Sequence, residues 1–458
     1  MRKIKRKYAP HVPEACLTAA REISGVRAKK IPQMREWRCA AQSNKNALPF
    51  LFDGRAALAV RKATPHGVKT VDLYVKETYN ITVNDDVKVI ILRVDRGAGK
   101  PSADTDLFGR TLEQWVCSAM RGLATERVPY REGEDILPVV KEHLDPLRAV
   151  TVVLYSDTPL ITYSAVIDSV RRLKRDETNV LRLPRGWVLR TEYVRTTEKI
   201  YTDRIITPGD DDFVTVFNYN QLSYAAEILR SRITYFFMDH GVEIVDPNTT
   251  FIGVDAVIEE GAKICPFTTI RGKSIIRSGA VIKEHCVIDS SVVESGAVIT
   301  ASTLTGALVY RNATVGPYAH LRTGAIVGVG ARIGDYVEIK NSRVGAGSKI
   351  SHLAYVGDAE IGENCNIGAG VVFANYDGAA KKKITLGDKV FVGSNSTLVA
   401  PLDIGSGAFV AAGSVITESV PPGALTIGRA RQTTREHWEH NAYTSTKSGD
   451  DAAHDDNN

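Results

Sequence analysis

The sequence predicts two joined fold classes, an α/β domain with a parallel sheet followed by an all-β parallel β-helix. Isoleucine recurs seven times at a spacing of six between Ile252 and Ile288, and the same spacing of aliphatic residues returns from Leu386 to Ile416. A period of six is neither the 3.6 of a helix nor the 2 of an ordinary strand. It is the hexapeptide signature of a parallel β-helix, in which each aliphatic side chain stacks inward on the one a coil away. Upstream of residue 247, strands alternate with helices, which indicates a parallel α/β sheet.

Composition places the chain among globular proteins with two or three domains. It has 458 residues, of which 43% are hydrophobic and 24% charged. No apolar run of about 18 residues predicts a membrane span. The basic start Met1–Lys7 lacks the apolar core of a secretion signal. Six scattered cysteines have no metal-binding spacing and favour a reducing compartment. We therefore expect a cytoplasmic protein without a membrane partner.

Residues 1–85 form a basic extension to which the sequence assigns no role. They hold 17 Lys/Arg and 7 Asp/Glu, a net charge of +10, whereas the whole chain carries +5. Such an arm either touches polyanions or is a solvated surface. No stacking-aromatic pattern or nucleic-acid motif accompanies the charge, so we expect no nucleic-acid partner. The weak alternation in Thr70–Val75 predicts a strand.

Residues 86–246 are predicted to form the α/β domain. Val87–Leu92 and Ala149–Leu154 are apolar and rich in β-branched residues, as strands are. Helical patterns cover three further segments, Thr111–Met120, Ala165–Lys174 and Tyr224–His240.

Residues 247–427 are predicted to form the β-helix, with about ten coils of roughly eighteen residues each. The six-residue repeat is interrupted at Ala374–Gly378, and Lys381–Lys383 follow. The interruption predicts a loop that projects from the coil. Pro421-Pro422-Gly423 closes the last coil. Residues 428–458 then form a polar arm and an Asp- and Asn-rich tail that we expect to be disordered.

Two cations interrupt adjacent coils. Arg322 and Lys340 are eighteen residues apart, so they are expected to lie one coil apart on the same face. Two cations held on a rigid sheet repel each other unless an anion binds between them. A phosphate is a suitable ligand for such a pair. Two solvated surface charges would give the same spacing.

His352 is the candidate general base. An imidazole takes up a proton near neutral pH, which suits that role. A hydrogen-bonded turn histidine is the alternative. A metal site made with His285 and His320 is a third interpretation, but their spacings of 35 and 32 residues are not multiples of one coil.

The ordered set of residues outside the core resembles a known family. Residues 315–438 resemble the C-terminal half of the bacterial bifunctional N-acetylglucosamine-1-phosphate uridylyltransferase/glucosamine-1-phosphate N-acetyltransferases. The matching segments are Val315–Arg322, Glu338–Ser342, His352–Asp358, Asn366–Gly370, Asn375–Gly378, Val392–Ser394 and Val420–Gly423. The resemblance implies a left-handed β-helix, a homotrimer with active sites between subunits, and transfer of an acetyl group from acetyl-CoA to an amino-sugar phosphate.

The resemblance also implies a role for each site residue. His352 is the base, and Asn375 steadies the tetrahedral oxyanion. Arg322 and Lys340 hold the sugar phosphate, Tyr355 and Asn366 contact the sugar, and Lys381 helps from the loop. The acetyl-CoA channel is lined by Ala369, Asn375, Tyr376, Ser394, Ala412 and Arg429.

The α/β domain resembles the nucleotidyltransferase half of the same family, a doubly wound, GT-A-like fold, but in degenerate form. After the strand Val89–Leu92, only Gly97-Ala98-Gly99 remains of the glycine-rich phosphate loop, and Arg and Asp side chains obstruct it. By resemblance Asp157 and Asn218 stand where the family holds Mg²⁺. We interpret the domain as a relic, with Mg²⁺ required only if it is active.

The sequence therefore predicts an acetyl-CoA-dependent glucosamine-1-phosphate N-acetyltransferase in the pathway to UDP-N-acetylglucosamine and peptidoglycan precursors. Two alternatives stay open. One is the full bifunctional enzyme, which also forms UDP-N-acetylglucosamine from UTP. The other is a non-catalytic trimeric scaffold that binds a sugar nucleotide.

Overall fold

The computed structural model describes residues 57–61, 70–74, 85–201 and 210–438. Strands β1 (Ala57–Arg61) and β2 (Thr70–Tyr74) pair antiparallel, with Ala57 opposite Tyr74. The predicted strand at Thr70–Val75 is thus confirmed as β2. The predicted disordered tail from Lys447 onward lies outside the described residues.

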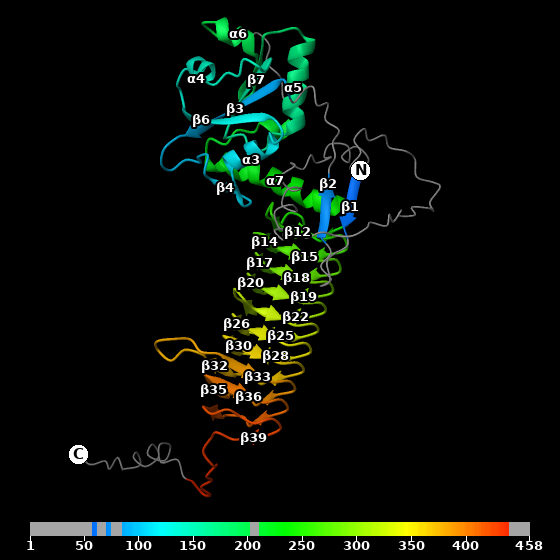
Figure 1. Cartoon of the computed structure of the whole chain (residues 1–458), viewed down its shortest axis with the longest axis vertical. Helices are drawn as coiled ribbons and strands as arrows, with labels where there is room; N and C mark the ends of the chain where they lie inside the picture. The colour runs from blue at the N-terminus through cyan, green and yellow to red at the C-terminus, as the bar shows by residue number, and fades with distance from the viewer. Residues whose placement is uncertain (1–56, 62–69, 75–84, 202–209, 439–458) are drawn as a thin grey trace, which may run out of the picture.

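A five-stranded sheet forms the α/β domain at one end of the molecule (Figure 1). Its strand order is β6-β3-β7-β9-β8; β6, β3 and β7 are parallel, and β9 and β8 run antiparallel to their neighbours. The two predicted strands are confirmed as the adjacent strands β3 and β7. The sheet consists of β6 (Ala124–Arg131), β3 (Val87–Asp95), β7 (Val150–Tyr155), β9 (Gly186–Arg190) and β8 (Val180–Leu183).

Helices cover both faces of this sheet, because β3 and β7 are apolar on both sides. One face packs against α3 (Leu112–Ala119) and α5 (Tyr163–Arg175). The other packs against α4 (Ile136–Glu142) and α6 (Thr191–Thr196). The short pair β4 (Asp106–Leu107) and β5 (Arg110–Thr111) precedes α3, and the 3₁₀ turn η1 (Asp210–Phe213) precedes the last helix.

Helix α7 (Tyr219–Asp239) joins the two parts of the chain and begins earlier than its predicted start at Tyr224. Asn218 caps it: the side chain of Asn218 accepts from the backbone N–H of Gln221, and the Gln221 side chain accepts from the backbone N–H of Asn218. In the first turn only Leu222 packs against the core while Tyr219 is exposed, so apolar periodicity marks this turn weakly.

The rest of the chain is a left-handed parallel β-helix of about 10 turns (Figure 1). In the described residues it has three sheets of 11, 10 and 9 strands, which form the three sides of a prism. We call them the first, second and third sheet. Residues one coil apart pair in register, as Ile252, Ile270 and Ile288 do, so the predicted hexapeptide coil is confirmed.

The strands are short because each side of the prism takes one hexapeptide. The first sheet consists of Glu243–Ile244 (β10), Lys263–Ile264, Val281–Ile282, Val298–Ile299, Thr314–Val315, Arg332–Asp335 (β25), Lys349–His352 (β28), Asn366–Ile367 (β31), Phe391–Val392 (β34), Phe409–Val410 (β37) and Leu425–Thr426 (β39). The second consists of Phe251–Ile252 (β11), Thr269–Arg271, Val287–Asp289, Thr303–Thr305, His320–Leu321 (β23), Glu338–Lys340 (β26), Tyr355–Gly357 (β29), Val372–Ala374 (β32), Thr397–Val399 and Val415–Ile416. The third consists of Val257–Ile258, Ile275–Ile276, Val292–Val293, Leu308–Val309, Ile326–Val327, Arg343–Val344, Ala359–Ile361, Ile384–Leu386 (β33) and Leu402–Ile404 (β36).

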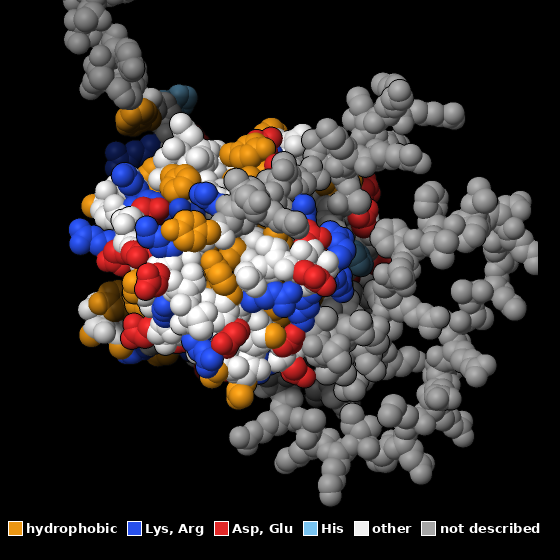
Figure 2. Space-filling model, turned by 90° about the horizontal axis from the view of Figure 1, so that it is seen from above, with side chains coloured by type: hydrophobic (Ala, Val, Ile, Leu, Met, Phe, Trp, Pro, Cys, Tyr) orange, Lys and Arg blue, Asp and Glu red, His pale blue; other side chains and the backbone are white. Residues whose placement is uncertain are grey.

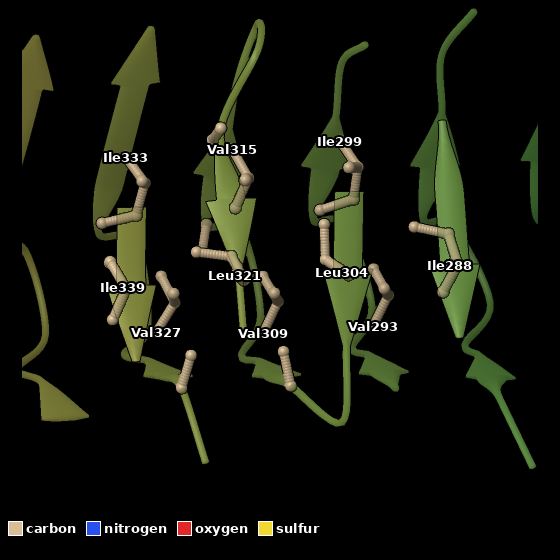
Figure 3. Close-up of a cluster of buried hydrophobic side chains, with 14 of the residues drawn as sticks. Ile288, Val293, Ile299, Leu304, Val309, Val315, Leu321, Val327, Ile333 and Ile339 are labelled. Carbon is tan, nitrogen blue, oxygen red and sulfur yellow. The ribbon is translucent and has the colours of Figure 1, made fainter. Parts of the chain in front are cut away.

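Stacked aliphatic side chains fill the prism (Figure 3). Ile299, Val315 and Ile333 lie above one another on the first sheet, and each is fully or almost fully buried. Burying one such side chain stabilises the fold by roughly 1.5–3 kcal/mol, so the ladder repeats that gain on each coil. The frame is therefore regular and holds residues outside the core at fixed places.

One loop leaves the prism between β32 and β33 (Figure 1). Phe373 on β32 pairs with Leu398 on the next coil, a separation of 25 residues instead of the usual 16 to 18. The prediction of an extruded loop is confirmed. We call residues 375–383 the flap.

The two parts of the chain share one hydrophobic core. Leu229 and Ile233 on α7 are fully buried in the same cluster as Ile244 and Ile252 of the first coil. Arg110 also reaches Asp255 of the solenoid at 3.4 Å. Seen from above, the end of the molecule shows Lys/Arg and Asp/Glu side chains intermixed (Figure 2). Among the described helices, none is long and apolar enough to cross a membrane.

Candidate active site

The predicted cation pair is confirmed on the second sheet. His320 of β23 pairs with Glu338 of β26, which places Arg322 directly beside Lys340 on the next coil. Lys381 of the flap joins them. Lys381 and, less strongly, Arg322 push the pKa of Lys340 below its usual value because the three positive charges lie together. The flap thus completes a cluster of three cations.

Sequence reasoning missed the acidic partner of this cluster. Glu338 accepts a hydrogen bond from Arg322 at 2.7 Å, and both side chains are partly exposed. The carboxylate orients the guanidinium but cancels only one of three positive charges. Glu338 lies 16 residues after Arg322, about one coil, which is the signal that would have pointed to it.

His352 is paired with Asp335, a second residue that the sequence reading missed. The two residues lie on neighbouring strands β28 and β25, and the His352 Nδ1 lies 2.6 Å from Asp335 Oδ1. A carboxylate only accepts hydrogen bonds, so Nδ1 carries a proton, and in the neutral imidazole Nε2 is then the nitrogen with the lone pair. Hydrogen bonds from its own backbone N–H and from His352 hold the pKa of the Asp335 carboxyl below its usual range.

Asn375, at the start of the flap, is buried and is held by Asp358. The Asn375 amide nitrogen donates to one carboxylate oxygen of Asp358, and Asn341 donates to the other at 2.6 Å. The three residues are each 17 positions apart and stack on three successive coils. An amide nitrogen has two hydrogens, so Asn375 keeps one donor for a ligand.

Gly357 makes room for Tyr355 and Asn375 to converge. A Cβ at Gly357 would lie 2.6 Å from both the Tyr355 hydroxyl and Asn375 Nδ2. Gly357 also stands directly above Lys340 in the register of β26 and β29. The tyrosine, the buried amide and the cation cluster therefore border one patch of the second sheet.

The residues predicted to line a cofactor channel follow the corner between the first and second sheets. Lys349, Asn366, Phe391 and Phe409 pair along the first sheet, so the residues three positions later also align. We call this line the corner file; it consists of Asp335, His352, Ala369, Ser394 and Ala412. A Cβ at Gly368 or Gly393 would lie within 2.5 Å of the next coil's backbone, so these glycines let the coils pack closely beside the file.

The other predicted residues lie at the edges of this arrangement. Arg429 is exposed, and its Cδ would lie 3.7 Å from a Cβ at Gly413, beside the end of the corner file. The Tyr376 hydroxyl donates to the carbonyl of Gly378 at 2.6 Å within the flap. Asn366 lies on the outward face of the first sheet, around the corner from Tyr355 and Lys340. One chain thus brings Arg322, Lys340 and Lys381 together on the second sheet, whereas Asn366 faces the other side of the corner. Asp157 and Asn218 lie apart from them, in the α/β domain and at the start of α7.

No histidine cluster supports a metal at His352. His285 stacks on Phe267 with ring centroids 5.1 Å apart, and His320 stands two residues from Arg322 on the second sheet. Within the described residues, no three His, Cys, Asp or Glu side chains are placed to hold a metal ion.

The donors predicted for Mg²⁺ in the α/β domain do not fit that ion. Asp157 is buried, and both of its carboxylate oxygens accept hydrogen bonds from arginines, Arg96 and Arg185. The Asn218 side-chain oxygen is the cap of α7. Mg²⁺ needs oxygen ligands that face it, whereas these oxygens already have donors.

Two families of hexapeptide repeats match the solenoid. Residues 341–375 match the bacterial transferase hexapeptide (six repeats), and residues 383–418 match the hexapeptide repeat of succinyl-transferase. These matches include His352, Ala369, Ser394 and Ala412 of the corner file, and they end and begin at the two ends of the flap.

Curated relatives confirm the predicted resemblance over about half of the chain. The bifunctional protein GlmU of Clostridium novyi is 44% identical over 233 residues, 51% of this chain and 51% of the relative. Those of Shouchella clausii and Clostridioides difficile are 45% and 42% identical over 47% and 54% of this chain, and 48% and 55% of the relatives. The chain spans about half the length of the curated relatives it matches.

Solved structures overlap only in part. The Caulobacter crescentus perosamine N-acetyltransferase in complex with CoA and GDP-perosamine is 24% identical, with a TM-score of 0.22 over 25% of this chain and 53% of that one. The Francisella novicida UDP-N-acetylglucosamine acyltransferase is 18% identical, with a TM-score of 0.28 over 40% and 66%. At these values the overlap has no bearing on function.

Proposed function

We propose that this protein is an acetyl-CoA-dependent N-acetyltransferase whose acceptor is an amino-sugar 1-phosphate, glucosamine 1-phosphate. One observation carries the proposal: a histidine with a free Nε2, held by a carboxylate, stands at the corner beside a cluster of three cations. The 41–45% identity of the relatives named bifunctional protein GlmU supports the same reading.

His352 acts as the general base. Asp335 fixes the tautomer in which Nε2 is unprotonated, so Nε2 can accept a proton from the acceptor's amino group. The amine nitrogen attacks the thioester carbonyl carbon as it loses that proton. The carbon–sulfur bond then breaks, and the proton held on Nε2 passes to the departing sulfur of CoA. No acyl-enzyme is required, because holding both substrates in line supplies much of the rate.

The cation cluster binds the acceptor's phosphate. Arg322, Lys340 and Lys381 repel one another without a ligand, as the lowered pKa of Lys340 indicates. A phosphate dianion removes that repulsion and accepts several charge-assisted hydrogen bonds. The phosphate would therefore anchor the sugar so that its amine reaches the corner.

Three further residues complete the acceptor and transition-state contacts. The Asn375 N–H that Asp358 does not use is the donor for the tetrahedral oxyanion, and its burial strengthens that bond. Tyr355 contacts the sugar ring from the same patch. Asn366 lies on the other face of the corner, so it would contact an acceptor bound to a neighbouring copy of the chain.

Acetyl-CoA lies along the corner file in this proposal. Ala369, Ser394 and Ala412 present small side chains along one line that leads to His352; Ser394 and Ala412 are exposed and Ala369 is half-buried. Tyr376 borders this line from the flap, and Arg429 at its far end suits the negatively charged phosphates of the cofactor. The thioester would lie at His352 and the phosphates at Arg429, so the cofactor binds in one direction along the solenoid.

We propose a homotrimer because the corner file has only one wall in a single chain. A second copy placed against this corner would close the channel and bring its Asn366 to the site. The expected observation is a mass three times 49.9 kDa in solution by light scattering. A monomer with full activity would contradict the shared site.

Release of CoA measured against several amino-sugar phosphates tests the proposed function. Glucosamine 1-phosphate should be acetylated faster than glucosamine 6-phosphate or galactosamine 1-phosphate. His352→Ala should lower turnover by about 10²–10⁴-fold, the usual contribution of a general base. His143→Ala is the matched control, because it also removes an imidazole paired with a carboxylate, Glu126 at 2.8 Å, but in the α/β domain.

The same assays separate the alternatives. Pyrophosphate release from UTP and N-acetylglucosamine 1-phosphate with Mg²⁺ would establish the bifunctional enzyme that the names of the relatives favour. If no amino-sugar phosphate gave CoA release, the result would favour the alternative of a non-catalytic scaffold. Full turnover by His352→Ala would show that His352 is not the general base, but it would not contradict the proposed acetyl transfer.

A further inference from the structure

The carboxyl edge of the α/β sheet carries a closed ionic network. Asp157 follows β7 and is 2% exposed. Arg185, from the turn between β8 and β9, donates through Nε and Nη2 to the two Asp157 oxygens at 3.3 and 2.9 Å. Arg96, which follows β3, also donates to Asp157. Three separate segments of the chain thus meet at one carboxylate.

Glu132, in the loop after β6, is the second acid of the network. It accepts from Arg185 Nη2 at 3.1 and 2.8 Å and from Arg96 Nη2 at 3.1 Å. Burial opposes ionisation of Glu132, but the two arginines outweigh it and hold its pKa below the usual value. Burial likewise opposes the charge on Arg185, yet Glu132 and Asp157 raise its pKa. Two positive and two negative charges therefore balance.

Aromatic rings fix the two arginines in place. The Arg185 guanidinium lies 3.9 Å from the centroid of Tyr155, and those of Arg96 and Arg185 lie 4.6 and 5.0 Å from that of Phe217. Their side chains are only 7% and 15% exposed. Arg96 also donates to the carbonyl of Val216 at 3.1 Å. Stacked, buried arginines with this many partners do not swing away at low cost.

The network borders a cavity of about 1040 Å³, lined in part by Arg96, Glu132 and Phe217. The cavity lies at the carboxyl ends of β3 and β6, the edge of an α/β sheet at which ligands bind. Glu132 lines the cavity, and without the two arginines Glu132 and the buried Asp157 would be a pair of bare carboxylates beside it. Such a pair is what a divalent cation binds.

We propose that the α/β domain is a metal-independent module, in which the guanidinium groups of Arg96 and Arg185 take the place of a divalent cation between Asp157 and Glu132. A divalent ion at this place would meet two positive charges and no free carboxylate oxygen, and arginine does not lose its proton in proteins. A ligand that meets this network is therefore bound without a metal ion between Asp157 and Glu132.

Mn²⁺ titration of the full chain, followed by electron paramagnetic resonance of the free ion, tests this inference. The natural protein should show no Mn²⁺ binding that depends on Asp157. The double variant Arg96→Ala/Arg185→Ala bares both carboxylates and should gain a saturable Mn²⁺ site. Adding Asp157→Asn to the double variant should abolish that site. Arg171→Ala/Arg175→Ala, which removes two exposed guanidinium groups of α5, is the matched control and should gain none.

A second measurement needs no variant that could fail to fold. The midpoint of thermal unfolding of the natural protein should be the same in excess MgCl₂ and in EDTA, because a ligand bound only by the folded state would raise it. Mn²⁺ binding by the natural protein that Asp157→Asn removes would overturn the inference, as would an Asp157-dependent rise of the midpoint with Mg²⁺. CoA release should be unaffected in every variant, so this test is independent of the acetyltransferase proposal.

Discussion

At the scale of single residues, the candidate base depends on a partner one coil away. The short bond between His352 and Asp335 keeps a proton on Nδ1 and leaves Nε2 free. The two residues align because β25 and β28 pair in register. A Cβ at Gly334 would lie 1.9 Å from the carbonyl of Ser351, so only glycine lets the two coils approach closely beside this pair. Asp335 is therefore a positioning residue in the proposed mechanism.

Asp335→Asn should lower kcat by roughly tenfold, while the KM for the acceptor changes little. The amide can donate to Nδ1 and favour the tautomer with its proton on Nε2, which cannot act as the base, so the pH–rate profile should change together with kcat. The pH dependence of CoA release checks both effects. Asp335→Glu should restore part of the activity, whereas an unchanged pH profile in Asp335→Asn would show that the carboxylate does not act through His352.

Lys340→Met should weaken binding of the sugar phosphate without lowering the thermal stability of the protein. The substitution removes one of three clustered cations, so the midpoint of thermal unfolding should stay the same or rise slightly without ligand. The KM for the sugar phosphate should rise by about tenfold, because one charge-assisted contact with the phosphate is lost. Steady-state kinetics and a thermal melt measure the two. Lys389→Met, an exposed lysine outside the cluster, is the control, and a matched rise of KM there would contradict the phosphate site.

At the scale of elements, the flap is ordered by its own aspartate. Asp377 accepts from the backbone N–H groups of Ala380 at 2.7 Å and Ala379 at 2.9 Å, and it pairs with Lys382 at 3.1 Å. These bonds hold the pKa of the Asp377 carboxyl below its usual value. The flap carries Asn375, Tyr376 and Lys381, so its conformation places three of the proposed site residues.

The flap should therefore keep its order across the working pH range. Because the folded-state pKa of Asp377 lies below that of an unfolded aspartate, about 3.9, its contribution is present above that pH and is lost only as the pH falls through the lower folded value. Amide exchange of the flap, corrected for the intrinsic rate, should be constant between about pH 5 and pH 8.

Asp377→Asn should raise flap exchange and the KM for both substrates at neutral pH. Asp403→Asn, an exposed aspartate on β36, is the matched control and should do neither. Protection of the flap that is unchanged in Asp377→Asn would show that the loop is ordered by other contacts.

At the scale of the whole molecule, α7 makes the α/β domain and the solenoid one cooperative body. Its buried face belongs to the same hydrophobic cluster as the first coil. Neither part can lose this helix without exposing its own apolar surface. Unfolding of one part is therefore coupled to the other.

Ile233→Ala should lower the free energy of unfolding by about 2–5 kcal/mol, because a fully buried aliphatic side chain leaves a cavity at the junction. The loss should lower a single calorimetric transition that both parts share. Met238→Ala, at an exposed position of the same helix, should change stability by less than about 0.5 kcal/mol. Two separate transitions, with only one moved by Ile233→Ala, would contradict the shared core.

Sequence periodicity predicted the solenoid well but predicted α7 less well. A hexapeptide repeat is a local property that occurs in every coil. The stacked core residues could therefore be predicted from the repeat, and the flap from its interruption. The first turn of α7 has one apolar residue in phase, Leu222, and its start depends on the cap at Asn218. The strand β10 was missed for a similar reason: Glu243–Ile244 precedes the first regular hexad.

The sequence by itself determined the coil, its register and hence the contact between Arg322 and Lys340, because a fixed repeat converts spacing along the chain into position in space. Only the tertiary structure decided the partners that close each site: Asp335 on His352, Lys381 on Lys340, and two arginines on Asp157. The flap and the loops of the α/β sheet have no period. Their side chains meet through the path of the folded backbone, which spacing along the chain does not encode.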